Sequence, residues 1–105
     1  MESPAPAVVD NPGKSRYEIY VGDELAGFVT YELDGDVISF LHTQVEPEFE
    51  GGGFASQLVR ATLDDARNRK LSVLPFCPYV SAWIKRHPDY ADLVPASRRQ
   101  NFGLS

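Results

Sequence analysis

Hydrophobic and polar residues alternate along the first half of this 105-residue chain with the period of β-strands. Turn residues separate the runs, with Gly22-Asp23 after the first and Asp34-Gly35, a strong hairpin signal, after the second. We therefore expect three antiparallel strands over residues 16–21, 24–32 and 37–45.

The third of these runs carries apolar residues at both odd and even positions. Successive side chains of a strand point to opposite faces, so Ile38, Phe40 and His42 would share one face. The other face would carry Val37, Leu41, Thr43 and Val45. We expect an interior strand that is covered on both sides.

The second half of the chain changes to a helical period. After three consecutive glycines at 51–53, small and apolar residues recur three and four positions apart as far as Ala66, which predicts a helix. A short strand over residues 71–75 follows. Pro78 suits the first position of a second helix, which Pro88 would stop. The apolar face of that helix would carry Val80, Trp83 and Ile84.

This order of elements predicts a mixed α+β domain over residues 15–95. Residues 1–14, rich in Pro, Asn and Gly, are expected to form a flexible arm, and residues 96–105 a polar tail. The chain has no apolar stretch long enough to span a bilayer, no signal-peptide pattern and a single cysteine. We expect a cytoplasmic protein without a metal site.

Charge divides the chain. Residues 1–50 carry eleven acids and two bases, whereas residues 51–105 carry four acids and eight bases, for a net charge of −5. This acidity argues against a nucleic-acid-binding protein. The basic second half would suit a compact anionic ligand, although helices also commonly carry Lys and Arg.

The glycines at 51–53 stand between a strand and a helix, a position that suits an anion such as a phosphate. Glycine lets a ligand approach the backbone closely, and the start of a helix offers unpaired N–H groups and a positive dipole end. A Walker A loop would need Gly-Lys-Ser/Thr here, but Phe54-Ala55 follows Gly53. A Rossmann motif would need an acidic residue after the next strand, which ends instead at Pro75-Phe76-Cys77.

The run from Val45 to Val59 resembles the acetyl-CoA-binding motif of GNAT-type N-acetyltransferases. Gly53 and Ala55 match that motif, whereas Glu50 stands where the family has Arg or Gln. The segments His42-Thr43-x-Val45, Pro75 to Val80 and Trp83 to Tyr90 resemble the small single-domain branch of the family. The resemblance covers residues 16–94 and implies a GNAT-like fold with a splayed central strand pair.

The resemblance also implies a cofactor site for acetyl-CoA or CoA. The strand end at Thr43 to Val45 would pair with the pantetheine arm, and Glu50 would repel the pyrophosphate unless its side chain turns into solvent. The pyrophosphate would be held by the backbone N–H groups of Gly51, Gly52, Gly53, Phe54 and Ala55, together with Ser56.

Two residues are candidates for catalysis. Cys77 lies between a strand and the Pro78 helix start, where unpaired N–H groups make a thiol more nucleophilic. The family branch implies a nucleophile at this position, but free cysteines often only fill space in a core. His42 could act as a general base or pack in the core. Tyr79 is a candidate general acid or a packing residue, and His87 a helix-end residue.

Two functions remain. The first is an N-acetyltransferase that moves acetyl from acetyl-CoA to an amine, either directly or through an acetyl-Cys77 intermediate. The second is a non-catalytic CoA- or acyl-CoA-binding module with an interaction or regulatory role, which Glu50 favours.

Overall fold

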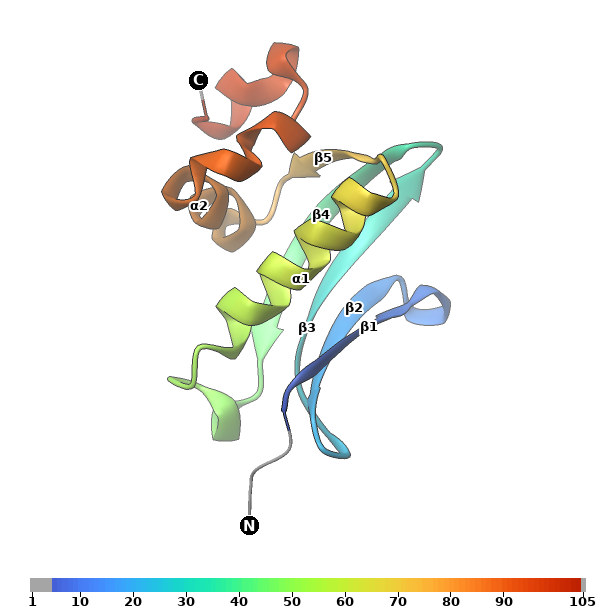
Figure 1. The fold of residues 1–105 in the computed structure, drawn as a ribbon, viewed down its shortest axis with the longest axis vertical. Coiled ribbons are helices and arrows are strands. Elements are labelled where there is room, and N and C mark those ends of the chain that lie inside the picture. The colour runs from blue at the N-terminus through green and yellow to red at the C-terminus, as the bar shows by residue number, and fades with distance from the viewer. Residues whose placement is uncertain (1–4, 105) are drawn as a thin grey trace.

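The computed structural model describes residues 5–104, and in that range a five-stranded sheet is covered on one face by a long helix (Figure 1). The strands are β1 (Ala7–Asn11), β2 (Arg16–Val21), β3 (Glu24–Asp34), β4 (Val37–Val45) and β5 (Ser72–Pro75). The α-helices are α1 (Phe54–Asn68) and α2 (Pro78–Arg86). Short 3-10 helices lie at Pro12–Lys14, Pro47–Phe49, Pro88–Leu93 and Ala96–Phe102.

The strands follow their sequence order across the sheet, β1-β2-β3-β4-β5. The first four are antiparallel, and α1 carries the chain back so that β5 lies parallel to β4. The predicted mixed α+β class is confirmed. The predicted order of three strands, helix, strand and helix corresponds to β2–β4, α1, β5 and α2, and β1 precedes them as a strand that was not predicted.

The core lies between the sheet and the two α-helices. α1 turns the predicted stripe of small and apolar residues toward the sheet, where Tyr17, Ile19 and Phe40 are buried. α2 buries Val80, Trp83 and Ile84, as its apolar pattern predicts. The buried residues of α1 are Leu58, Val59, Thr62, Leu63 and Ala66.

The prediction of a flexible arm over residues 1–14 is wrong for residues 7–11, which form the edge strand β1; residues 1–4 lie outside the described range. β1 pairs with β2 from Ala7–Tyr20 to Asn11–Arg16. Asp10 accepts a hydrogen bond of 2.7 Å from the Tyr31 hydroxyl and forms an ion pair with Arg69 after α1. Partners more than twenty residues away therefore hold a segment whose composition alone suggests a loose chain.

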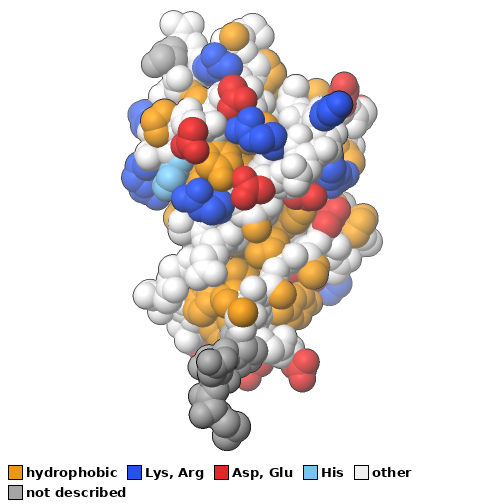
Figure 2. Space-filling model, viewed as in Figure 1, with side chains coloured by type: hydrophobic (Ala, Val, Ile, Leu, Met, Phe, Trp, Pro, Cys, Tyr) orange, Lys and Arg blue, Asp and Glu red, His pale blue; other side chains and the backbone are white. Residues whose placement is uncertain are grey.

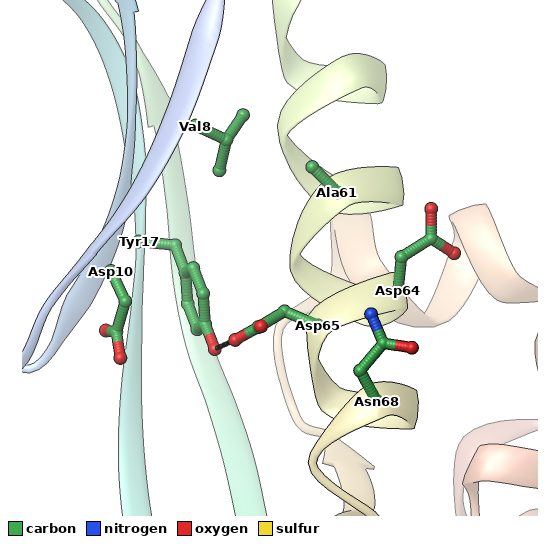
Figure 3. A pocket seen from close by; sticks show the side chains of 7 residues that line it. All are labelled: Val8, Asp10, Tyr17, Ala61, Asp64, Asp65 and Asn68. Carbon is green, nitrogen blue, oxygen red and sulfur yellow. Dashed lines mark hydrogen bonds between the residues drawn. The ribbon is translucent and has the colours of Figure 1, made fainter.

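An open pocket of about 290 Å³ lies between β1, β2 and α1 (Figure 3). The hydroxyl of Tyr17 donates a hydrogen bond to Asp65 of α1, and Arg69 donates one of 2.9 Å to the same hydroxyl. These polar contacts connect α1 to the N-terminal edge of the sheet, at a distance from the glycine turn.

The expected polar tail also has structure. Ala96–Phe102 forms a 3-10 helix, and the ring of Phe102 packs edge-on against Phe76, with centroids 5.2 Å apart. Phe76 is nevertheless 51% exposed. Phe102 thus packs the tail against the domain, and Arg99 Nε adds hydrogen bonds to the Ala91 and Val94 carbonyls at 3.1 and 3.0 Å.

A bulge at Leu41 changes the expected faces of β4. Tyr31 pairs with Phe40 but the preceding Thr30 pairs with His42, so Leu41 is an extra residue. Because side chains alternate along a strand, the extra residue places Thr43 on the same face as Phe40 and moves His42 to the opposite face.

The opposite face of the sheet is open rather than covered. Leu41 is 40% exposed, Val9 is similarly exposed, and His42 is exposed. The predicted double coverage of β4 is therefore wrong, although β4 is interior in the sense that it pairs with both β3 and β5.

Figure 2 shows that Lys and Arg side chains are mixed with Asp and Glu over the upper half of the visible face, while apolar side chains gather lower down. The mixing agrees with the ion pairs of Arg67 with Asp92 and of Arg69 with Asp65. Part of the net positive charge of residues 51–105 is thus neutralised by ion pairs with nearby carboxylates. Within residues 5–104, no helix combines the length and apolarity needed to cross a membrane.

Candidate active site and cofactor pocket

The glycine turn joins the 3-10 helix Pro47–Phe49 to α1 in a conformation that needs glycine. Gly51 and Gly53 have φ angles of +84° and +77°, in the left-handed region, and Gly53 is the N-cap of α1. With no side chain, Gly53 cannot cap the helix, so the first N–H groups of α1 remain available to another acceptor. A Cβ at Gly51 or Gly53 would meet nothing within 4 Å, which shows open space beside the turn.

A pocket of about 220 Å³ lies at this turn. It contains six of the residues predicted for the cofactor site, which come from the end of β4, the turn and the first turn of α1: Val45, Gly51, Gly53, Phe54, Ala55 and Ser56. Phe49, Glu50 and Tyr79 complete the lining. Gly52 and Thr43, also predicted for the cofactor site, are not part of this lining; a Cβ at Gly52 would stand 2.6 Å from the Phe54 ring.

The parallel pair β4 and β5 separates next to this pocket. The two strands pair only from Val37–Ser72 to Phe40–Pro75, and the Cys77 N–H makes one further hydrogen bond of 2.8 Å to the Phe40 carbonyl. β4 then continues to Val45 beside β3 alone, as far as the described residues show. The splayed strand pair is confirmed, and it leaves backbone groups of Leu41–Val45 open to a ligand.

Cys77 lies at the point where the strands separate. It is the N-cap of α2, it is 3% exposed, and its Sγ atom lies 3.2 Å from Thr43 Oγ1. The bulge at Leu41 makes this contact possible, because with Leu41 in regular alternation the Thr43 side chain would point to the other face of the sheet. Thr43 therefore contributes its side chain to the thiol as well as its backbone to the strand end.

His42 lies on the open face of the sheet, away from Cys77. Its ring packs edge-on against Phe28, with centroids 6.5 Å apart, and the Arg16 guanidinium lies 4.3 Å from the Phe28 centroid. The structure thus does not bring the two predicted catalytic side chains together, because they lie on opposite faces of the sheet.

Glu18 provides a fixed negative charge on the open face. The carboxylate is 3% exposed and accepts hydrogen bonds from Arg16 at 2.7 Å, Tyr20 at 3.0 Å and Asn11 at 3.2 Å. Burial by itself would raise the pKa of Glu18, but the hydrogen bonds from these three groups outweigh it and hold the pKa below its ordinary value. The face of the sheet beside His42 therefore carries the ionised, hydrogen-bonded pair Arg16–Glu18.

The lining residues Phe49 and Tyr79 were not assigned to the cofactor pocket from the sequence. Phe49 packs edge-on against Phe54 across the glycine turn, with centroids 5.6 Å apart. Tyr79 precedes Trp83 by four positions, so both lie on the face of α2 that turns toward the start of α1. The four-residue spacing from Trp83 is the one signal in the sequence that links Tyr79 to the pocket at the glycine turn. His87 is the C-cap of α2, as a helix-end residue should be.

Comparison with known proteins agrees with this geometry. Residues 16–93 match the family model described as GCN5-related N-acetyl-transferase. A solution structure of a "GCN5-like putative N-acetyltransferase" from Staphylococcus aureus resembles the fold with a TM-score of 0.65. The two proteins are 21% identical, and the match covers 85% of this chain and 87% of that chain. At this identity the likeness shows a shared fold.

Proposed function

This chain belongs to the GCN5-related N-acetyltransferase family, and on that premise we propose that it transfers the acetyl group of acetyl-CoA to an amine. The observation that carries the proposal is the pocket of about 220 Å³ where the glycine turn, the start of α1 and the end of β4 meet. This pocket lies beside the opening between β4 and β5, so one ligand can occupy both.

The chemistry of the pocket fits the pyrophosphate of CoA. The N–H groups at Gly51 to Ser56 and the positive end of the α1 dipole favour a negative group there. Val45 belongs to this pocket, and the backbone of Thr43 to Val45 would hydrogen-bond the pantetheine arm where β5 no longer pairs. The arm would then direct the thioester toward Cys77.

The first route of transfer uses Cys77. Its sulfur attacks the thioester carbonyl, a new carbon–sulfur bond forms, and the bond to CoA breaks so that CoA leaves as its thiol with one proton. An amine then attacks the acetyl-Cys77 thioester, the amide forms, and Cys77 recovers a proton. The position of the thiol at the start of α2 and its contact with Thr43 support this route.

The second route is direct transfer. An amine that approaches from the open face would meet His42, which is exposed there, and lose its proton to the imidazole or to water as it attacks the thioester. The amide forms, the carbon–sulfur bond to CoA breaks, and CoA leaves as its thiol. Because His42 and Cys77 lie on opposite faces of the sheet, the two routes require the amine to arrive differently.

One observation favours a second function, a non-catalytic CoA-binding module. Glu50 lines the pocket, and a carboxylate there opposes a pyrophosphate. Weak cofactor binding would then serve an interaction or regulatory role rather than turnover.

Incubation with acetyl-CoA, followed by intact-protein mass spectrometry and an amine panel, tests these proposals. One added acetyl group that is present in the wild type and absent in Cys77→Ser supports the cysteine route. Amine acetylation that survives Cys77→Ser but is lost in His42→Gln supports the direct route. CoA binding without any transfer supports the binding module, and a melting temperature unchanged by CoA would contradict both functions.

A further inference from the structure

Trp83 reaches the cofactor pocket through a single hydrogen bond. The indole is fully buried in α2, and its Nε1–H donates to the Ser56 hydroxyl oxygen at 2.9 Å. An indole N–H can only donate, so the direction of this bond is fixed. A buried indole needs such a partner, and here the partner lies twenty-seven residues earlier, on another helix.

This bond leaves the Ser56 proton available. A hydroxyl offers one donor and two acceptor lone pairs, and the contact with Trp83 uses only a lone pair. Ser56 is the third residue of α1 and lines the pocket, so its proton is close to the unpaired N–H groups of the first turn. A serine here could otherwise turn its hydroxyl back to the local backbone, and the bond from Trp83 opposes that alternative.

Trp83 is itself held in place by aromatic and polar contacts. The His87 ring stacks on the indole at 3.8 Å with an interplanar angle of 14°, and His87 Nδ1 lies 2.7 Å from the Trp83 carbonyl oxygen. Tyr90 packs edge-on against the indole with centroids 5.0 Å apart. The Arg60 guanidinium, one helical turn after Ser56, lies 5.1 Å over the Trp83 ring and adds a positive charge to this side.

We infer that Trp83 is a positioning residue that orients the Ser56 hydroxyl to donate a hydrogen bond to the pyrophosphate of CoA. The inference rests on the proposed cofactor site and assigns it a residue whose side chain lies in the core, outside the pocket lining. The indole does not touch the ligand; it acts through Ser56.

Because Trp83 is the chain's only tryptophan, its indole N–H gives a single NMR signal. We expect this signal to shift on titration with CoA, along with the amides of residues 51–56, and to stay unchanged with pantetheine, which lacks the phosphates. If CoA shifts the amides but leaves the indole signal in place, the inference is wrong while the cofactor site stands. If CoA shifts nothing, the proposed function itself fails.

Affinity for CoA provides a second test that does not depend on turnover. Ser56→Ala and Trp83→Phe should each weaken CoA binding about threefold to tenfold, as expected for one hydrogen bond. The double variant should be no weaker than Ser56→Ala alone, because Trp83 acts only through that hydroxyl. Additive losses would indicate a general structural effect of Trp83→Phe and would contradict the inference. If Trp83→Phe folds poorly, the Ser56→Ala variant is sufficient as a test. An affinity for CoA equal to that of the wild type in Ser56→Ala would contradict the inference.

Discussion

The Thr43 hydroxyl lies 3.2 Å from the sulfur of Cys77, across the point where β4 and β5 separate. The bulge at Leu41 places Thr43 on this face, and the hydrogen bond from the Cys77 N–H to the Phe40 carbonyl fixes the start of α2 beside it. A hydroxyl in this place can donate to a thiolate, which favours the nucleophilic form of the cysteine.

Thr43→Val keeps the shape of the side chain and removes the hydroxyl. We expect self-acetylation of Cys77 by acetyl-CoA to slow about tenfold, the cost of one hydrogen bond to a charged group. Time-resolved intact-protein mass spectrometry measures this rate. Thr43→Ser, which retains the hydroxyl, is the matched control and should stay close to wild type. Equal rates for Thr43→Val and wild type would show that the contact does not assist the thiol.

Removing the charge of Glu50 should improve cofactor binding. Glu50→Gln is expected to tighten CoA binding about twofold to fivefold at low salt, with a smaller gain as salt screens the repulsion. Glu48→Gln, a change in the same acidic segment but outside the pocket lining, is the control. Titration calorimetry at two salt concentrations measures both. A similar gain in the two variants would mean that overall charge, rather than the place of Glu50, sets the affinity.

Gly27 of β3 pairs with Val45 of β4, which lines the pocket. A Cβ there would stand 2.6 Å from the Gln44 carbonyl oxygen and 3.2 Å from the Val45 Cα atom. Gly27→Ala should therefore lower the free energy of unfolding by about 1–3 kcal/mol, measured by urea denaturation, and weaken CoA binding because Val45 lines the pocket. In Gly13→Ala the new Cβ meets only Asn11, at 3.5 Å, and we expect a change within about 0.5 kcal/mol.

The raised pKa values of Tyr17 and Tyr31 lead us to expect that the free energy of unfolding falls at alkaline pH. Burial, followed by the hydrogen bond and charge of Asp10, raises the pKa of Tyr31 to about 12, and burial with Asp65 raises the pKa of Tyr17. The folded state then keeps protons that the unfolded chain releases from about pH 10. The contribution of the two tyrosines to the free energy of unfolding is therefore complete below pH 10 and decreases as the pH rises through their folded-state pKa values.

Urea denaturation between pH 9 and 11.5 checks this slope, which reaches at most about 1.4 kcal/mol per pH unit for each tyrosine. Tyr31→Phe lacks one of the two groups and should show a shallower decline than wild type. If both proteins lose stability at the same rate, the environment of Tyr31 is not responsible.

Much of the fold could be predicted because its signals are local. Turn residues such as Asp34-Gly35, and the helix start at Pro78, mark boundaries from their own backbone preferences. β1 could not be predicted in this way, since the contacts of Asp10 with Tyr31 and Arg69 form only in the folded chain. The bulge at Leu41 likewise depends on the pairing of Thr30 and Tyr31, and no glycine marks it.

The same division holds for the candidate site. The glycines at 51–53 pointed to the pocket because their chemistry is contained in one short segment. Tyr79 comes to that pocket, and Thr43 to Cys77, only through tertiary packing. The misplacement of His42 followed directly from counting residues along β4 without the bulge.

The bulge residue Leu41 offsets the alternation of side chains along β4 by one position. If Leu41 were instead paired in regular alternation, His42 would face Cys77 and Thr43 would face the open side, although no side chain would have changed. The same sequence therefore contains two alternative sets of side chains for the opening, and the pairing of β4 with β3, which leaves Leu41 as a bulge, selects between them. A change of register at this point would alter the side chains at the opening without any substitution.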